Sequence, residues 1–253
     1  MAEPVDLTLP PYDGLMDLHG DVGGVPMSFA GNQWFLVDNL VSLLSERGVN
    51  AYIETIPPGL VRLRALGSPL RVGTLTISVR PRLVSLPPSM LEGLKIEDRY
   101  DYVEDTVVVA FRRGNAVRLE SWCELVDLSS RLPIAIPNPV TEGIGAQLKG
   151  VISESCGNYE TLASRSMITR VHHREIPTSL LGGSIYAGVM WVSEAKYWGL
   201  DYVEPRPTIV GRLSLALLSP SDNASRQAFG AFKSLSPKLK ELYESYGFRW
   251  IGT

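Results

Sequence analysis

The sequence predicts an α/β protein with largely parallel sheets flanked by helices. Short runs rich in apolar and β-branched residues, at 25–29, 49–56 and 83–86, are each followed by a segment typical of a helix. Strands that alternate with helices in this way indicate parallel pairing, because each helix returns the chain to the same end of the sheet. The strands also end in loops rich in proline, glycine and small polar residues. In a parallel sheet such loops share the carboxyl edge, where ligands commonly bind.

The first of these helices is expected over residues 34–47, where apolar residues recur near helical spacing and Gly48 follows as a stop signal. The run 49–56 predicts a strand. It leads through Pro57-Pro58-Gly59 into a second helix, which has proline in its first turn. The strand 83–86 ends in a third loop of this kind, formed by serine and proline.

The middle of the chain continues the alternation. Residues 106–111 predict a buried strand, and 121–128 a helix with Ser121 and Glu124 in capping-box spacing. A short strand at 134–136 then leads into NPVTEGIG, residues 138–145, where Thr141 occupies the expected N-cap position of a helix. Such a junction leaves backbone N–H groups free at the positive end of the helix dipole, which favours an anion or a carboxylate.

The last part repeats the pattern with longer elements. Thr178 is the expected cap of a short helix, and 185–192 and 213–218 are expected strands. A long helical region follows over 223–246, with a break near Pro237.

Two polar stretches divide the chain. Residues 100–105 and 200–207 separate an inner segment from two outer ones, which predicts lobe I at 1–104 and 203–253 and lobe II at 105–202. An inserted domain of this kind is joined to its host by two crossing strands. This is the connectivity of a hinged protein that closes on a ligand.

The composition is that of a soluble globular protein, with 45% hydrophobic and 20% charged residues among 253. The formal charge of −3 without a basic block argues against general affinity for nucleic acid or anionic lipid. No apolar run approaches the roughly 18 residues of a membrane span. The N-terminus lacks the basic start and apolar core of a secretory signal, so the chain as given is expected to be cytoplasmic.

The two cysteines, Cys123 and Cys156, lie outside any metal-ligand spacing. Two packed thiols are favoured over a zinc site, and the sequence does not decide whether they form a disulfide.

The densest polar cluster comprises Arg170, His172, His173, Arg174 and Glu175. Adjacent histidines on a strand point to opposite sides, so we expect no shared metal and no cofactor. A polar surface patch is the first interpretation, and an anion contact through His173 or Arg174 is the second. The sequence contains no nucleophile elbow, phosphate-binding loop or dinucleotide fingerprint. By spacing alone, Trp191 is expected to be a core residue more often than a ligand platform.

The order of these motifs resembles the type II periplasmic-binding-protein-like substrate-binding proteins, particularly the molybdate/tungstate-binding branch of ABC importers. The similarity covers roughly residues 25–248. The matching pieces are SFAGNQWF, ETIPPGL, VSLPPSM, TVVVAFRRGN, LPIAIPNPVTEGIG, GGSIYAGVMWVSEA and C-terminal helices ending in Gly-Phe.

This resemblance implies a two-lobed fold of the type II periplasmic-binding-protein class. The contacts that it implies with the ligand are at Gly31, Asn32, Pro58, Gly59 and Ser85 in lobe I, and at Thr141, Glu142, Gly143 and Trp191 in lobe II. The sequence departs from the family pattern in its first two loops, which lack the usual small hydroxyl residues. It also departs at Arg80-Pro81-Arg82, whose role the sequence does not define, and in the missing signal sequence.

We therefore expect a monomeric, non-enzymatic binding protein that clamps a small oxyanion between its lobes, with molybdate or tungstate first. The resemblance also implies an ABC-transporter membrane component as a partner. Two alternatives remain open: an intracellular ligand sensor of the same fold, and an enzyme that uses the cluster at 172–175 for acid–base chemistry.

Overall fold

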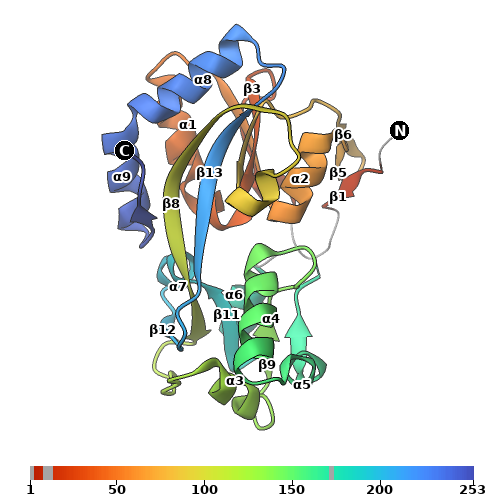
Figure 1. The fold of residues 1–253 in the computed structure, drawn as a ribbon, viewed down its shortest axis with the longest axis vertical. Coiled ribbons are helices and arrows are strands. Elements are labelled where there is room, and N and C mark those ends of the chain that lie inside the picture. Colours follow the sequence, from red (N-terminus) through yellow and green to blue (C-terminus); the bar gives the residue numbers. More distant parts are fainter. Residues whose placement is uncertain (1–2, 8–13, 171–173) are drawn as a thin grey trace. The chain divides into compact units, whose positions relative to one another are not determined.

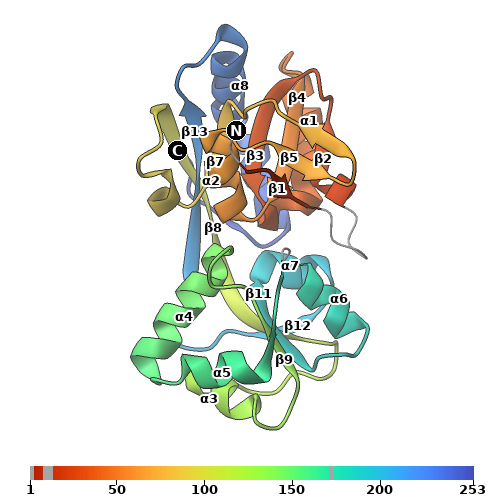
Figure 2. The same ribbon diagram turned by 90° about the vertical axis from the view of Figure 1, so that its right-hand side faces the viewer.

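A computed structural model describes residues 3–7, 14–170 and 174–253. The chain divides into two compact units, which are drawn in Figures 1 and 2. Unit 1 comprises Met1–Val103, Arg212–Ser245 and Arg249–Thr253, and unit 2 comprises Glu104–Gly211 and Tyr246–Phe248. Two strands, β8 (Ile96–Phe111) and β13 (Val210–Leu218), run from one unit into the other.

The sheet of unit 1 has a parallel centre and antiparallel flanks. Strand β3 (Val25–Ala30) pairs in parallel with β4 (Ala51–Ile56) on one side and with β7 (Leu83–Leu86) on the other. The antiparallel neighbours are β2 (Leu18–Gly20) beside β4 and β13 beside β7. Helices α1 (Val37–Ser45) and α2 (Pro58–Leu66) lie on opposite sides of this sheet (Figure 1). The sheet is therefore mixed, with the predicted parallel strands at its centre.

The N-terminal helix of unit 1 differs from the prediction of one helix over 34–47. The chain first forms a 3-10 helix, η2 (Gly31–Leu36), and becomes α-helical only in α1. A 3-10 turn is common where a helix begins. Its effect here is to place Gly31 and Asn32 inside a helical turn directly after β3.

Residues 70–77 form two strands that the sequence did not predict. Strands β5 (Leu70–Val72) and β6 (Leu75–Ile77) form a hairpin, and β1 (Val5–Asp6) pairs in parallel with β5 to complete a small separate sheet. Because β1 lies far away in the sequence, local patterns could not reveal this sheet. The other short elements of this unit are the 3-10 helices η1 (Gly14–Asp17) and η3 (Pro88–Leu91).

At the C-terminal end, the predicted break in the long helical region is confirmed. Helix α8 (Asn223–Ser234) is separated from α9 (Ser236–Ser245) by Leu235, and Pro237 is the second residue of α9. Asp222 and Ser225 form a capping box at the start of α8. The chain ends with β14 (Arg249–Trp250), which pairs with β8.

The sheet of unit 2 has the strand order β10-β9-β11-β8. Strand β9 (Ile134–Ile136) is parallel to β10 (Ser166–Ile168) and to β11 (Ala187–Trp191), whereas β8 is antiparallel to β11 and to β12 (Asp201–Val203). The predicted strand at 106–111 is the last part of β8, which has 16 residues. The helices of this unit are α3 (Trp122–Leu128), α4 (Gly143–Ser155), α5 (Tyr159–Arg165), α6 (Glu175–Leu181) and α7 (Val192–Tyr197).

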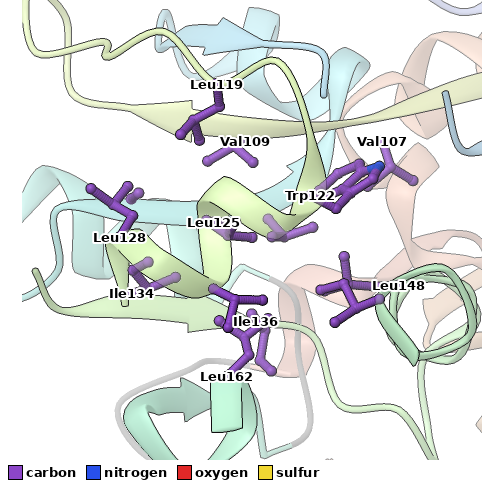
Figure 3. Close-up of a cluster of buried hydrophobic side chains, with 14 of the residues drawn as sticks. Val107, Val109, Leu119, Trp122, Leu125, Leu128, Ile134, Ile136, Leu148 and Leu162 are labelled. Atoms are coloured by element: carbon purple, nitrogen blue, oxygen red, sulfur yellow. The ribbon is translucent and has the colours of Figure 1, made fainter. Parts of the chain in front are cut away.

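The two faces of this sheet bury different side chains. Val107 and Val109 point to the face covered by α3, α4 and α5, where Trp122 is fully buried (Figure 3). Val108 and Ala110 lie in the core cluster with residues of α6 and α7. This alternation explains why residues 106–111 are continuously apolar, as a strand buried on both faces must be.

Two predicted helix caps in unit 2 are wrong, by one residue at α4 and by four residues at α6. Helix α4 begins at Gly143 with Glu142 as its N-cap residue, rather than at Thr141. Helix α6 begins at Glu175, so Thr178 lies inside it, where the Thr178 hydroxyl donates to the carbonyl of Arg174 at 2.8 Å. Threonine is a preferred N-cap residue type, which is why the sequence predicts a cap at both positions. The two helices begin at other residues in the structure.

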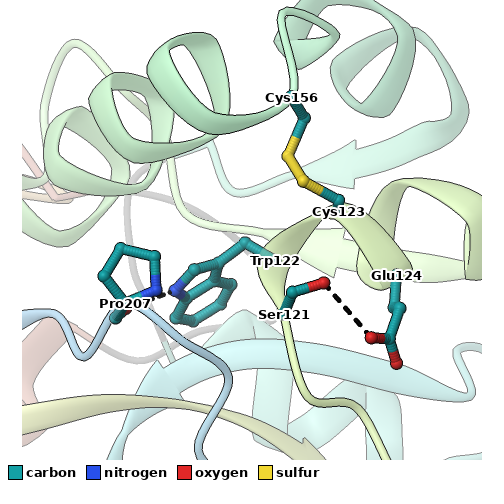
Figure 4. The surroundings of a disulfide bond; sticks show 6 residues. All are labelled: Ser121, Trp122, Cys123, Glu124, Cys156 and Pro207. Atoms are coloured by element: carbon teal, nitrogen blue, oxygen red, sulfur yellow. Dashed lines mark hydrogen bonds between the residues drawn. A yellow bond between two sulfur atoms is a disulfide. The ribbon is translucent and has the colours of Figure 1, made fainter.

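Cys123 and Cys156 form a disulfide, shown in Figure 4. The bond joins the first turn of α3 to the C-cap residue of α4. The sequence left this pairing undecided, because it depends on how the two helices pack and not on the spacing of the cysteines.

Candidate functional site

Three strand-to-helix junctions meet at one edge of the unit 1 sheet. Ala30 lies opposite Ile56, and Phe29 lies opposite both Thr55 and Ser85. The junctions that follow are therefore neighbours: Gly31-Asn32 in the centre, with Pro57–Gly59 and Pro87–Ser89 on either side. The structure thus brings together four of the five predicted site residues of this unit at the edge itself, and places Ser85 just inside it.

Asn32 is the most unusual polar residue at this edge. It is only 5% exposed, and its side-chain amide can offer both a donor and an acceptor to a ligand at this edge. Asn32 follows Gly31, which is also buried, in the first turn of η2.

Ser85 is occupied within the protein. Its hydroxyl lies 2.6 Å from the Tyr102 hydroxyl and accepts a hydrogen bond from Gln33 Nε2 at 3.0 Å. Tyr102 and Tyr243 both donate to Gln33 Oε1, which completes a buried network below the edge. Burial raises the pKa of Tyr102, so its phenol stays neutral and keeps its proton to donate.

Pro58 and Gly59 form the first turn of α2. The carbonyl of Pro57 accepts from the N–H groups of Leu60 and Val61, at 2.8 and 3.0 Å. Proline has no N–H, so the N–H of Gly59 is the first donor of the turn, and no described group accepts from it. Gly59 is partly exposed.

The corresponding edge of unit 2 is formed by the loop between β9 and α4. Asn138 organises this loop: its side-chain oxygen accepts from the N–H groups of Val140 and Thr141, at 2.9 and 3.3 Å. The N–H of Glu142 bonds to the Asn138 carbonyl at 3.0 Å. The Thr141 hydroxyl oxygen is buried and hydrogen-bonds to none of the described groups. The first unoccupied amides therefore begin at Gly143.

Glu142 turns inward. Its residue is 3% exposed, and its carboxylate accepts from the Asn138 N–H at 3.2 Å and from the Thr169 hydroxyl. Thr169 in turn accepts from the Asn138 N–H at 2.9 Å. Glu142 thus holds the loop in place, and Thr169, which follows β10, is a participant that the sequence did not single out.

Gly145 allows this loop to pack against α4. A side-chain Cβ at Gly145 would lie 2.4 Å from the Asn138 carbonyl oxygen and 2.6 Å from that of Pro137. Only glycine permits this approach.

Trp191 ends β11 and packs on the backbone of Gly211. A Cβ at Gly211 would lie 2.3 Å from Cη2 of the indole, so the ring covers this glycine directly. Trp191 is partly buried and also packs against the core of unit 2. The indole ring of Trp191 therefore packs on the protein itself, in addition to the contact with a ligand that is predicted for it.

His173 lies outside the described residues. Of its neighbours, Arg174 is 7% exposed and immediately precedes α6, and Glu175 is 3% exposed. Glu175 accepts from the N–H of Arg170 at 2.9 Å and lies 3.6 Å from the Arg170 guanidinium. Glu175 therefore pairs with Arg170.

Asp105 was not singled out from the sequence. It is 4% exposed, lies on β8, and accepts from the N–H of Thr106 at 2.8 Å and from the Ser193 hydroxyl. Burial raises the pKa of Asp105 to about 8, and nearby Glu194 adds to the rise, whereas the Ser193 hydrogen bond opposes it. The only signal in the sequence is an aspartate beside a strongly apolar run.

Among the described residues, no group of three or more His, Cys, Asp or Glu side chains is placed to hold a metal ion. The same residues include no helix with the length and apolar character that a membrane span requires.

Residues 83–249 match the family model described as bacterial extracellular solute-binding protein. No curated protein matches the sequence.

The fold is similar to solved periplasmic binding proteins. The Azotobacter vinelandii periplasmic molybdate-binding protein is 13% identical, with a TM-score of 0.67 over 88% of this chain and 98% of that chain. The sulfate-binding protein SubI from Mycobacterium tuberculosis is 18% identical, with a TM-score of 0.65 over 90% and 86%. PEB3 with bound L-phospholactate is 13% identical, with a TM-score of 0.65 over 89% and 99%. At these identities the similarity establishes the fold, the predicted α/β architecture of type II periplasmic binding proteins.

Proposed function

The chain belongs to the bacterial extracellular solute-binding proteins, a family of binding proteins rather than enzymes, and from this premise we propose that it captures a small anionic solute for ABC-type import. Molybdate and tungstate are the first candidates from the sequence, while the structural neighbours include binders of molybdate, sulfate and phospholactate. All three of these ligands are anions, which supports an anionic solute for this chain. Because they differ in chemical class, the class of the solute must be argued from this chain's own residues.

Asn32 is the observation that carries this proposal. Its side chain is 5% exposed, so packing limits its conformations before a ligand binds, and its amide can donate a hydrogen bond to an anion. The free N–H of Gly59 lies in the neighbouring junction and would add a main-chain donor. No cation is needed if several amides bond to the anion.

In unit 2, we propose that the first turn of α4, beginning at Gly143, and the Thr141 hydroxyl contact the solute. Helix α4 has 13 residues, so its N-terminal N–H groups and dipole attract negative charge. The buried Thr141 oxygen without a described partner supports a role in binding. Arg174, Trp191 and His173 stay predicted contacts, and Glu142 is proposed to act by holding the loop.

Thermal unfolding in the presence of candidate anions tests the proposal. A ligand at about one hundred times its dissociation constant stabilises the folded chain by about 2.7 kcal/mol, which raises the melting temperature measurably. We expect at least one small anion to do so, and Asn32→Ala to weaken the effect about tenfold in affinity, the loss of one hydrogen bond to a charged group. The matched control is Asn39→Ala on the exposed side of α1, which should change nothing. If no small anion shifts the melting temperature, the proposal is wrong.

A further inference from the structure

We infer that the solute is an organic acid with a single negative charge and a hydrocarbon part, rather than a fully oxygenated inorganic oxyanion. The inference rests on the proposed function and concerns the class of solute. It starts from the donors that the edge of unit 1 offers, and from those that it lacks.

Four prolines remove main-chain donors from this edge. Pro57 and Pro58 precede the first turn of α2 or lie in it, and Pro87 and Pro88 occupy the same positions at η3. Proline has no N–H, so within the described residues each outer junction offers one amide that is not hydrogen-bonded before the bonded turn, at Gly59 and at Ser89. The next amides, at Leu60 and Met90, already donate to the carbonyls of Pro57 and Pro87.

The hydroxyl groups at the ends of the two outer strands are also unavailable. Thr55, on β4, lies with its hydroxyl 3.2 Å from His19 Nε2 and donates to Asp17 at 3.3 Å. Ser85, on β7, is bonded to Gln33 and Tyr102. Both residues are fully buried. The two side chains best suited to replace the missing amides therefore face the interior.

Asn32 is a second and independent observation that points to a ligand here. It is more than nine-tenths buried. Its amide adds a neutral donor group, which suits the head group of a monoanion but replaces little of the hydration shell of a dianion such as sulfate or molybdate.

The balance of forces then favours an organic acid. Removing a doubly charged ion from water is unfavourable unless many donors replace the hydration shell. The edge instead presents the partly exposed rings of Pro58, Pro87 and Pro88, which are apolar surface. Each methylene that a ligand buries against such surface raises affinity about fourfold.

The loop of unit 2 has the same character. Asn138 occupies the amides of Val140 and Thr141, so these two donors are not available to a ligand. A monoanion needs fewer donors than a dianion and is therefore easier to accommodate there.

Isothermal titration with a graded series tests the inference. The inorganic ligands are sulfate and molybdate, and the organic ligands are methane-, ethane- and propanesulfonate together with acetate, propanoate and butanoate. The sulfonates keep the tetrahedral head group of sulfate while losing one charge and gaining hydrocarbon. We expect organic members to bind more tightly than both inorganic ions, with affinity rising about two- to fourfold for each added methylene.

Proline variants provide the converse test. Pro58→Ser and Pro88→Ser each restore an N–H and add a hydroxyl, so each should raise sulfate and molybdate affinity about tenfold. The matched control is Pro237→Ser, an exposed proline in the first turn of α9, which should have no effect.

Three results are possible that would each overturn a different statement. If sulfate or molybdate binds native protein more tightly than every organic acid, the solute class is wrong although the proposed function stands. If the two proline variants fold, as judged by circular dichroism, but their preference for organic over inorganic anions equals that of native protein, the prolines do not determine this preference. If no anion of either class binds native protein or the variants, the proposed function itself fails.

Discussion

Glu54 on β4 and Arg64 in the last turn of α2 form an ion pair in the interior of unit 1. Both side chains are 1% exposed, and Arg64 Nε donates to Glu54 Oε2 at 2.9 Å. Arg64 also donates to the carbonyls of Ser68 and Val79, at 2.6 and 2.7 Å. The guanidinium thus ties β4, the end of α2 and the segment before β7 together, and fixes the position of the edge.

We expect Arg64→Ala to lower the free energy of unfolding by about 3–5 kcal/mol, because it leaves the carboxylate of Glu54 buried and uncompensated. Urea unfolding followed by circular dichroism measures this loss. The matched control is Arg71→Ala, which breaks the pair with Asp6 on the surface, where the side chains are 49% and 35% exposed. That change should cost less than about 1 kcal/mol. Equal losses in the two variants would show that burial does not govern the effect.

Asp105 makes the stability depend on pH in a defined direction. Burial raises its pKa from 3.8 to about 8 in the folded chain, so the folded state binds the proton more tightly than the unfolded state does. The stability that this proton provides is complete below about pH 4 and is lost as the pH rises to about 8. We expect Asp105→Asn to remove this decline and to be more stable than native protein at pH 8. Unfolding curves at several pH values measure it, and a variant with the same decline as native protein would contradict the assignment.

Among single residues, the sequence identified those at the ends of strands and missed the groups that hold them. Asn32 and Thr141 could be predicted because a strand followed by small polar residues indicates a junction. Thr169 could not, because its hydrogen bond with Asn138 spans 31 residues and depends on β10 lying beside β9. Whether the predicted contacts bind a ligand stays a prediction.

At the scale of elements, the disulfide links α3 to the end of α4 and closes a loop of the chain with a sequence separation of 33. Cross-linking such a loop restricts the unfolded chain and stabilises the folded one by about 3–4 kcal/mol. We expect the Cys123→Ser/Cys156→Ser double variant to unfold at correspondingly lower denaturant concentration. Dithiothreitol should have the same effect on native protein and none on the double variant. Indifference of native protein to the reductant would contradict this expectation.

Helix α4 offers a matched pair of glycines. At Gly145 an added methyl would meet the Asn138 carbonyl at 2.4 Å, whereas at Gly150 nothing lies within 4 Å. We expect Gly145→Ala to displace the 138–142 loop and to weaken anion binding. Gly150→Ala should be neutral or stabilise the helix by up to about 1 kcal/mol. Thermal unfolding and anion titration of both variants measure the difference, and equal behaviour would mean that the close approach of loop and helix is unimportant.

The alternation of strands and helices could be predicted because each element leaves a local pattern. Residues 106–111 are apolar because both faces of β8 are covered there, and Pro237 marks the start of α9. The remaining ten residues of β8 were not predicted as strand, since their polar side chains break the apolar pattern. Hydrogen-bonded partners far away in the sequence hold this part extended: β14 pairs with β8, and the N–H of Ile251 bonds to the Tyr102 carbonyl at 2.9 Å.

At the scale of the whole molecule, the chain is an α/β protein of two units, and its family is that of solute-binding proteins. The order of the junctions along the chain carried the family resemblance, although individual loops had changed. Those changes, among them Pro57-Pro58-Gly59 in the second loop, leave the fold intact. The predicted lobe boundaries at 104/105 and 202/203 stay predictions of how the chain is organised.

The most direct measurement is the stoichiometry of anion binding by isothermal titration, on native protein and on Asn32→Ala in parallel. The account predicts one saturable site per chain in native protein and at least a tenfold loss of affinity in the variant. Absence of saturable anion binding in native protein, or equal affinity in both proteins, would contradict it.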